Sequence, residues 1–212
     1  MRATLIHRET VELDIGELRR RLARPASESA SGDPGTDSAT SSHRPASVLI
    51  PIVARPVELT VLFTRRTTHL RDHSGQISFP GGRAEPHDPS PESTALRETE
   101  EEIGLNPGHV ELVGRLAEYY TRTGFRITPV VGFVTPPFEL RIDAYEVDEV
   151  FEVPLSFLLD PRHHLLQSRE FFGEMRSFFA IPYDRHYIWG ATAGLLVNLY
   201  RHLVEQGMGS GE

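Results

Sequence analysis

The 212-residue sequence contains no cysteine. Disulfide bonds, thiolate metal ligands and thiol nucleophiles are therefore excluded. The chain also lacks long hydrophobic runs, since its longest uncharged apolar stretch, 188–200, is shorter than a bilayer-spanning helix. Residues 1–17 contain charged side chains and no continuous apolar segment, so we predict no secretory signal. A cytoplasmic protein is the simplest expectation.

Positive charge is also scarce. Lysine and arginine together number 22 against 30 aspartates and glutamates, which gives a formal net charge of −8. A net negative field disfavours nucleic acids and anionic membranes, so we expect neither as a partner. Hydrophobic residues make up 39% of the chain, which is enough for a globular core. We expect a small-molecule substrate, and keep a homodimer as an open alternative.

The composition divides the chain into three parts. Residues 26–42 hold no aliphatic side chain larger than alanine and no aromatic one, so they cannot bury enough surface to offset the entropy of ordering. We predict an N-terminal segment over 1–25 with a short helix beginning after Asp14, a flexible linker over 26–44, and a compact domain over 45–207.

Short strands and helices mix within the compact domain without strict alternation, which favours an α/β fold with a mixed sheet and helices on both faces. Apolar, β-branched runs predict strands over 46–54, 59–64, 110–120, 126–134 and 178–182. Helices are expected over 91–103 and 189–206, and a strand passing into a short helix over 149–159.

Three glutamates share one face of the helix predicted over 91–103. Glu98, Glu101 and Glu102 occupy positions i, i+3 and i+4, which are neighbours on a helical surface. Like charges at this spacing repel one another, and a bound cation would reverse that repulsion. Oxygen ligands favour Mg²⁺ or Mn²⁺ over zinc. The alternative for an acidic helix is a solvated face without function.

The surroundings of these glutamates form a longer pattern, Gly82-x5-Asp88-x8-Arg97-Glu98-x2-Glu101-Glu102-x-Gly104-Leu105. It resembles the Nudix box, G-x5-E-x7-R-E-U-x-E-E-x-G-U, in which U is aliphatic. The departures are an aspartate at 88, one extra residue before Arg97, and a threonine at 99. None of them affects the helix glutamates.

This resemblance implies a Nudix α/β/α sandwich that hydrolyses a diphosphate bond with Mg²⁺ or Mn²⁺. Glu98 and Glu102 would be the principal metal ligands, and Glu101 a further ligand or the base that orients water. The same resemblance implies structural support of the box by Asp88, Arg97 and Gly104.

The run before the box indicates the substrate. Residues 62–82 read LFTRRTTHLRDHSGQISFPGG, which is similar to the L-L-T-x-R-[SA]-x3-R-x3-G-x3-F-P-G-G signature of coenzyme A pyrophosphatases. The implied reaction converts coenzyme A to 3′,5′-ADP and 4′-phosphopantetheine. Arginine binds phosphate oxygens in a bidentate manner, and glycine lets the backbone approach them closely. The predicted substrate-binding residues are Arg65, Arg66, Arg71, Gly81 and Gly82.

Several alternatives stay open at this point. The substrate could be ADP-ribose, a nucleotide sugar or a dinucleotide polyphosphate, and a silent Nudix module that senses nucleotides is the second rival. Glu149 is a candidate catalytic carboxylate, with a solvated loop as the alternative. Tyr119, Tyr120 and Phe125 either line an adenine or pantetheine pocket or pack within the sheet.

Overall fold

The computed structural model describes residues 14–26, 31–33, 43–69, 74–171 and 173–208. Arg71, one of the predicted substrate-binding residues, lies outside these ranges, as do 27–30 and 34–42 of the predicted linker. Among the helices in the described ranges, none has the length and apolar character needed to cross a membrane.

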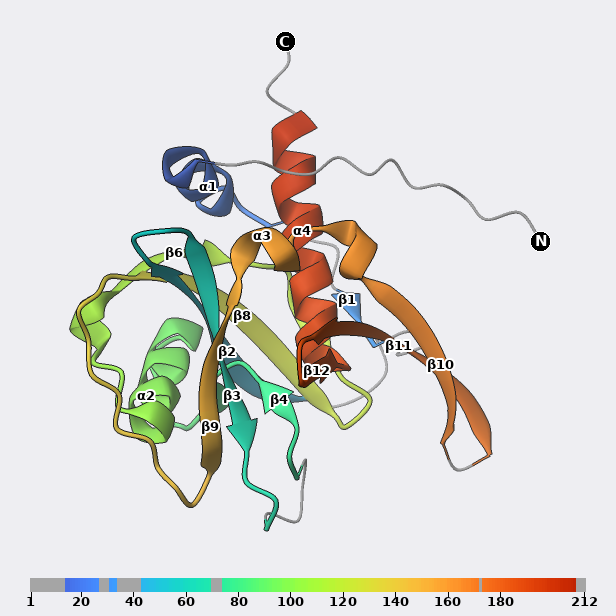
Figure 1. Ribbon diagram of the computed structural model, residues 1–212. Helices are drawn as coiled ribbons and strands as arrows, with labels where there is room; N and C mark the ends of the chain where they lie inside the picture. Colours follow the sequence, from blue (N-terminus) through green and yellow to red (C-terminus); the bar gives the residue numbers. More distant parts are fainter. Residues whose placement is uncertain (1–13, 27–30, 34–42, 70–73, 172, 209–212) are drawn as a thin grey trace.

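A mixed sheet lies at the centre of the molecule (Figure 1). Its middle strands are β2 (Arg44–Ala54) and β8 (Phe125–Val134), which run parallel to each other. β2 is also antiparallel to β3 (Leu59–Arg66) at one end and to β5 (Gly81–Arg83) at the other. The remaining strands of this sheet are β1 (Ser31–Gly32), β4 (Ile77–Ser78), β6 (Val110–Arg115), β7 (Tyr119–Tyr120) and β9 (Val147–Pro154).

Helix α2 (Pro91–Ile103) covers one face of this sheet, and its bounds agree with the prediction. Ser90 caps the helix by accepting a hydrogen bond from the Ser93 N–H, and Pro91 occupies the first turn. Gly104 ends the helix in the left-handed region at φ +67°. Ala95 and Ile103 are fully buried in an apolar cluster with side chains of β2, β3 and β8.

A larger apolar cluster fills the other face. It joins Phe63 and Phe133 of the sheet to Leu196 and Leu199 of the last helix. The helices that cover this face are α1 (Ile15–Leu22), α3 (Leu155–Leu158) and α4 (Ala191–Met208). Figure 1 shows α2 and α4 on either side of the sheet. The α/β/α sandwich predicted from the sequence is therefore confirmed.

Several strand predictions need correction. The strand predicted over 110–120 is interrupted after Arg115, and its end forms the separate strand β7. Apolar side chains continue beyond the break, at Leu116, Ala117 and Tyr119, so the run of apolar residues did not reveal it. A second sheet contains β10 (Leu165–Phe171), β11 (Glu174–Tyr183) and β12 (His186–Trp189), of which only part of β11 was predicted. Trp189 belongs to β12, so α4 begins two residues later than expected.

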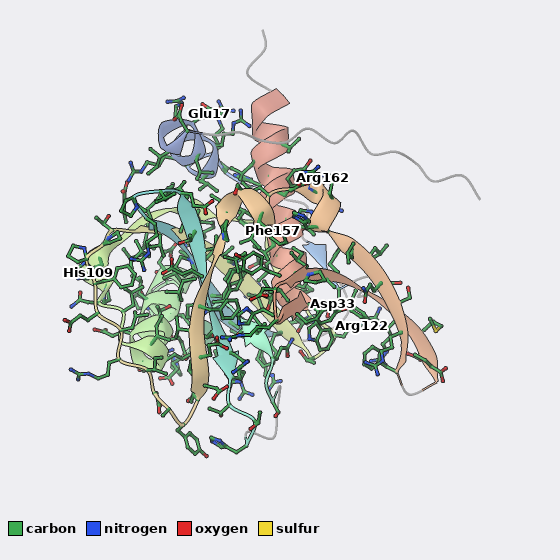
Figure 2. All side chains as sticks on the ribbon, in the orientation of Figure 1. Glu17, Asp33, His109, Arg122, Phe157 and Arg162 are labelled. Atoms are coloured by element: carbon green, nitrogen blue, oxygen red, sulfur yellow. The ribbon has the colours of Figure 1, made fainter. Side chains whose placement is uncertain are left out.

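The N-terminal segment is joined to the rest of the molecule. Leu18 and Leu22 of α1 belong to the larger cluster, and the Arg21 guanidinium donates to the Leu203 carbonyl of α4. Strand β1 pairs with β7, and Asp33 accepts hydrogen bonds from the Tyr119 hydroxyl and the Arg122 N–H. Figure 2 shows Asp33 and Arg122 close together.

Part of the predicted linker therefore belongs to the sheet, since both β1 and the first residue of β2 fall within 26–44. A composition poor in apolar side chains did not reveal pairing through the backbone. The division of the chain into an N-terminal segment, a linker and a domain over 45–207 otherwise stays a prediction.

Helix α1 provides a test of this packing. We expect Leu18→Ala to lower the free energy of unfolding by about 2–5 kcal/mol, because the Leu18 side chain is only 1% exposed. The control is Ile15→Ala on the same helix, where the side chain is 38% exposed and the expected change is below about 1 kcal/mol. Urea unfolding measures both. Equal midpoints for the two variants would show that α1 does not share the core.

Candidate active site

Helix α2 presents its glutamates beside the glycine pair of β5. Thr94, Ala95, Thr99 and Ile103 are buried toward the sheet, which turns the face of Glu98 and Glu102 toward Gly81 and Gly82. The two carboxylates lie close enough to repel each other electrostatically. The structure thus brings the predicted principal metal ligands together.

Glu102 is the most deeply placed of the three glutamates. Its side chain is 7% exposed, and its carboxylate accepts a hydrogen bond of 3.2 Å from the Gly81 N–H. The nearest cation is the Arg66 guanidinium, at 3.7 Å. Burial raises the pKa of Glu102 to about 8, because a carboxylate deprived of water disfavours its charged form.

The Glu98 carboxylate packs directly against the backbone of Gly82. A Cβ atom at position 82 would overlap the carboxylate, so this position accepts only glycine while Glu98 keeps its place. Burial also raises the pKa of Glu98, and the Arg97 guanidinium partly opposes that shift. The backbone of Gly81 and Gly82 therefore contacts both carboxylates.

Glu101 differs from its neighbours because its side chain is 60% exposed. Its carboxylate lies 3.0 Å from Arg97 Nη1, and the same nitrogen lies 3.1 Å from Glu98. Arg97 also donates to both oxygens of Asp88, at 3.0 and 2.9 Å, and to the Arg83 carbonyl. These hydrogen bonds hold the pKa of Asp88 well below its usual range. Arg97 thus links the loop before α2 to the glutamates on it.

Gly104 lies at the other end of the helix. Its positive φ suits glycine, and a Cβ there would lie 2.8 Å from the backbone nitrogen of Arg141. The loop after β8 therefore packs closely on the end of α2, with the Arg141 N–H donating to the Ile103 carbonyl.

The arginines before the box are compensated by acids. Arg65 lies 2.7 Å from Asp148 and 3.1 Å from Glu149. Arg66 lies at 3.7 Å from both Glu102 and Glu146. The Arg66 guanidinium therefore faces the buried Glu102 carboxylate. The Arg65 guanidinium is paired with two acids at the start of β9.

The structure does not bring Glu149 to the glutamates of α2. Its carboxylate is bound by Arg185, contacts His186 Nε2 at 3.4 Å, and lies on the side of β9 that carries Phe151. Phe151 stacks on Phe63 in the larger cluster, which is the face opposite α2.

Glu146 is the acid of this segment that lies near the site, because it raises the pKa values of both Glu98 and Glu102. The sequence analysis named Glu149 as the candidate carboxylate of this stretch and gave Glu146 no role. The alternation of side chains along β9 could have assigned Glu149 to the other face, but the position of Glu146 before the strand depends on the loop.

These groups can bind a hard cation. Glu98, Glu101 and Glu102 share Arg97 at 3.1 Å from Glu98 and Arg66 at 3.7 Å from Glu102, so negative charge is left that a divalent ion would compensate. Across the described ranges, however, no three His, Asp or Glu side chains are grouped closely enough to hold a metal as they stand. The carboxylates of Glu98 and Glu102 provide two such ligands, and the exposed Glu101 side chain has room to turn.

Comparison with known proteins identifies the family. A family model for the NUDIX domain matches residues 43–173. NudL, an uncharacterized Nudix hydrolase of Escherichia coli strain K12, is 42% identical over 161 residues, which cover 76% of this chain and 83% of NudL.

Solved structures show a more distant similarity. The Nudix hydrolase RenU from M. smegmatis is 20% identical, with a TM-score of 0.46, covering 61% of this chain and 81% of that one. A binary complex of the C. elegans Ap4A hydrolase is 14% identical, with a TM-score of 0.45, covering 52% and 80%. Because the family model spans more than half of the chain and NudL is a relative over most of it, this protein belongs to the Nudix hydrolase family.

Proposed function

We propose that this Nudix hydrolase cleaves the diphosphate bond of coenzyme A, or of an acylated or oxidised derivative, to give 3′,5′-ADP and 4′-phosphopantetheine. The observation that supports hydrolysis most strongly is the pair of half-buried and buried carboxylates, Glu98 and Glu102, against Gly81 and Gly82. The similarity of residues 62–82 to the coenzyme A pyrophosphatase signature supports the choice of substrate.

We assign the binding of Mg²⁺ or Mn²⁺ to Glu98 and Glu102, with Glu101 as a further ligand or as the base that orients water. When bound, such a cation neutralises charge that develops on the diphosphate and makes bound water more acidic. The protein's own part is to hold two carboxylates in a water-poor position. Because Arg97 holds Glu98 and Glu101 through one nitrogen, it positions them without contacting the substrate.

We assign the binding of the diphosphate to Arg66 and the glycine pair. The Arg66 guanidinium faces Glu102 without a close ion pair, so it can donate to phosphate oxygens beside the carboxylates. The space beside the two glycines is filled by Glu98 at position 82 and by Ser47 and Val48 at position 81, so a substrate would use their partly exposed backbone edges.

Arg65 and Arg71 stay predicted substrate ligands. Glu149 stays a candidate base from the sequence alone, and Glu146, which lies nearer to Glu98 and Glu102, is the second candidate. A cytoplasmic location and a homodimer are likewise predictions from the sequence.

A substitution at Asp88 tests whether its ion pair with Arg97 stabilises the Nudix box. We expect Asp88→Asn to lower the free energy of unfolding by about 1–3 kcal/mol, because Arg97 loses its carboxylate partner. The pKa of Asp88 is depressed in the folded protein. Its stabilising contribution is therefore present above the unfolded value of about 4 and is lost as the pH falls below it.

Urea unfolding from pH 7 down to acid pH measures this contribution. The difference between wild type and variant should shrink as the pH falls, whereas Glu85→Gln, at an exposed position in the same loop, should change little. A difference that does not vary with pH would contradict the role given to the Asp88 carboxylate.

Substitutions of the helix glutamates test whether Glu98 and Glu102 bind the divalent cation. We expect Glu98→Gln and Glu102→Gln each to reduce hydrolysis by more than about 100-fold, because neutral amides hold a divalent cation poorly. Both variants should fold, and Mg²⁺ should raise the melting temperature of the wild type but not of Glu102→Gln. Glu100→Gln is the matched control, because Glu100 is exposed on the same helix. Normal turnover by both variants would show that the assignment is wrong.

Parallel assays with coenzyme A and 3′-dephospho-coenzyme A test the substrate. We expect kcat/KM to be at least about tenfold higher for coenzyme A, since a further charged contact contributes on the order of 1.4 kcal/mol. Product separation by chromatography in the presence of Mg²⁺ measures both rates. Equal rates, or faster turnover of ADP-ribose, would favour another nucleoside diphosphate derivative.

A further inference from the structure

Beside the candidate active site lie two arginines for which no described residue provides a carboxylate partner. The Arg44 guanidinium lies 4.3 Å from the centre of the Phe125 ring, and the Arg83 guanidinium lies 5.4 Å from the same centre. Both side chains are exposed, and neither forms an ion pair with any residue in the described ranges. We call these two residues the arginine pair.

Strand pairing brings the arginine pair together. Arg44, at the start of β2, is the register partner of Phe125, and Arg83, at the end of β5, is the partner of Ala46. Phe125 and Ala46 thus hold the two arginines at the same end of the sheet. The Arg83 carbonyl also accepts a hydrogen bond from Arg97, so the backbone of Arg83 is fixed by the same side chain that binds Asp88.

The arginine pair lies on the opposite side of β5 from the carboxylates. Successive side chains of a strand point to opposite faces. Position 82 faces the Glu98 carboxylate, so the side chain of Arg83 points to the other face. A ligand that contacts both Glu98 and the arginine pair therefore has to pass around this short strand.

The other arginines near the site are already compensated. Arg65 and Arg66 each lie within 4 Å of two acids, which weakens their attraction for a further anion. No described acid compensates the arginine pair in this way, although the whole chain carries a net charge of −8. The Phe125 ring lies close to both guanidinium groups but offers them no acceptor oxygen, so their N–H groups stay available to phosphate oxygens.

We propose that the arginine pair binds a phosphate monoester that the substrate carries in addition to its diphosphate. This inference rests on the proposed function, because the diphosphate has to reach Glu98 and Glu102 on the α2 side of β5. A group held by the arginine pair is then a second anionic group of the same molecule. A phosphate monoester carries a charge of about −1.5 to −2 at pH 7, which two guanidinium groups match. In coenzyme A this group is the 3′-phosphate.

A binding experiment on the full chain tests the proposal without turnover. Isothermal titration in EDTA compares 3′,5′-ADP, which has the monoester at the 3′ position, with 5′-AMP, which lacks it. We expect the wild type to bind 3′,5′-ADP about tenfold or more tightly than 5′-AMP. In the double variant Arg44→Gln/Arg83→Gln this ratio should fall to about threefold or less, with the affinity for 5′-AMP nearly unchanged.

The matched control is Arg126→Gln. Arg126 follows Phe125 on β8, is exposed, and lies 3.6 Å from Glu118, so its removal should leave the ratio unchanged. Phe125→Leu, which keeps both charges but removes the ring, should lower the ratio by less than the double variant does. Melting curves establish that each variant is folded.

The outcomes separate this proposal from the proposed function. An unchanged ratio in the double variant overturns the role of the arginine pair, even if coenzyme A is hydrolysed normally. An equal loss in Arg126→Gln also overturns it, because the effect would then be general surface charge. If coenzyme A is not hydrolysed but the ratio depends on the arginine pair, the monoester site stands and the proposed reaction fails.

Discussion

The structure depends on placing the carboxylates of Glu98 and Glu102 against the backbone of Gly81 and Gly82. Withdrawing a carboxylate from water is unfavourable, and the raised pKa values of both side chains express that cost, even though Arg97 lies 3.1 Å from Glu98. The rest of the fold has to offset it. A divalent cation at this position would be bound tightly, because its charge would offset the cost of burying the two carboxylates. A cation held in this way can neutralise the charge of a diphosphate, so the arrangement fits hydrolysis of a diphosphate bond.

Three features of α2 make this placement stable. The helix is anchored to the sheet by fully buried side chains such as Ala95 and Ile103. Its ends are determined by the Ser90 cap and by the left-handed conformation of Gly104. Arg97 then joins Asp88 in the preceding loop to Glu98 and Glu101. Helix, loop and strand β5 thus form one hydrogen-bonded unit, which holds the carboxylates of Glu98 and Glu102 in place.

The central sheet separates two chemically different surfaces. On the α2 side, acidic side chains gather around Gly81 and Gly82. On the other side, Glu149 is held by Arg185 at β9, and the guanidinium groups of the arginine pair lie near the Phe125 ring. A substrate with several anionic groups could use both sides, provided that it passes the short strand β5. The net charge of the chain conceals this division, because opposite charges are separated in space and not along the sequence.

The sequence by itself determined the family, the α/β/α fold and the exact bounds of α2, because these depend on local signals: capping residues, apolar periodicity and the spacing of the box. It could also bring Glu98 and Glu102 onto one helical face, since helix geometry is local. It could not separate Glu146 from Glu149, detect the pairing of β1, or bring Arg44 beside Arg83 and Phe125. Those outcomes depend on strand register and on the course of loops, and contacts between residues far apart in the chain exist only once the sheet has formed.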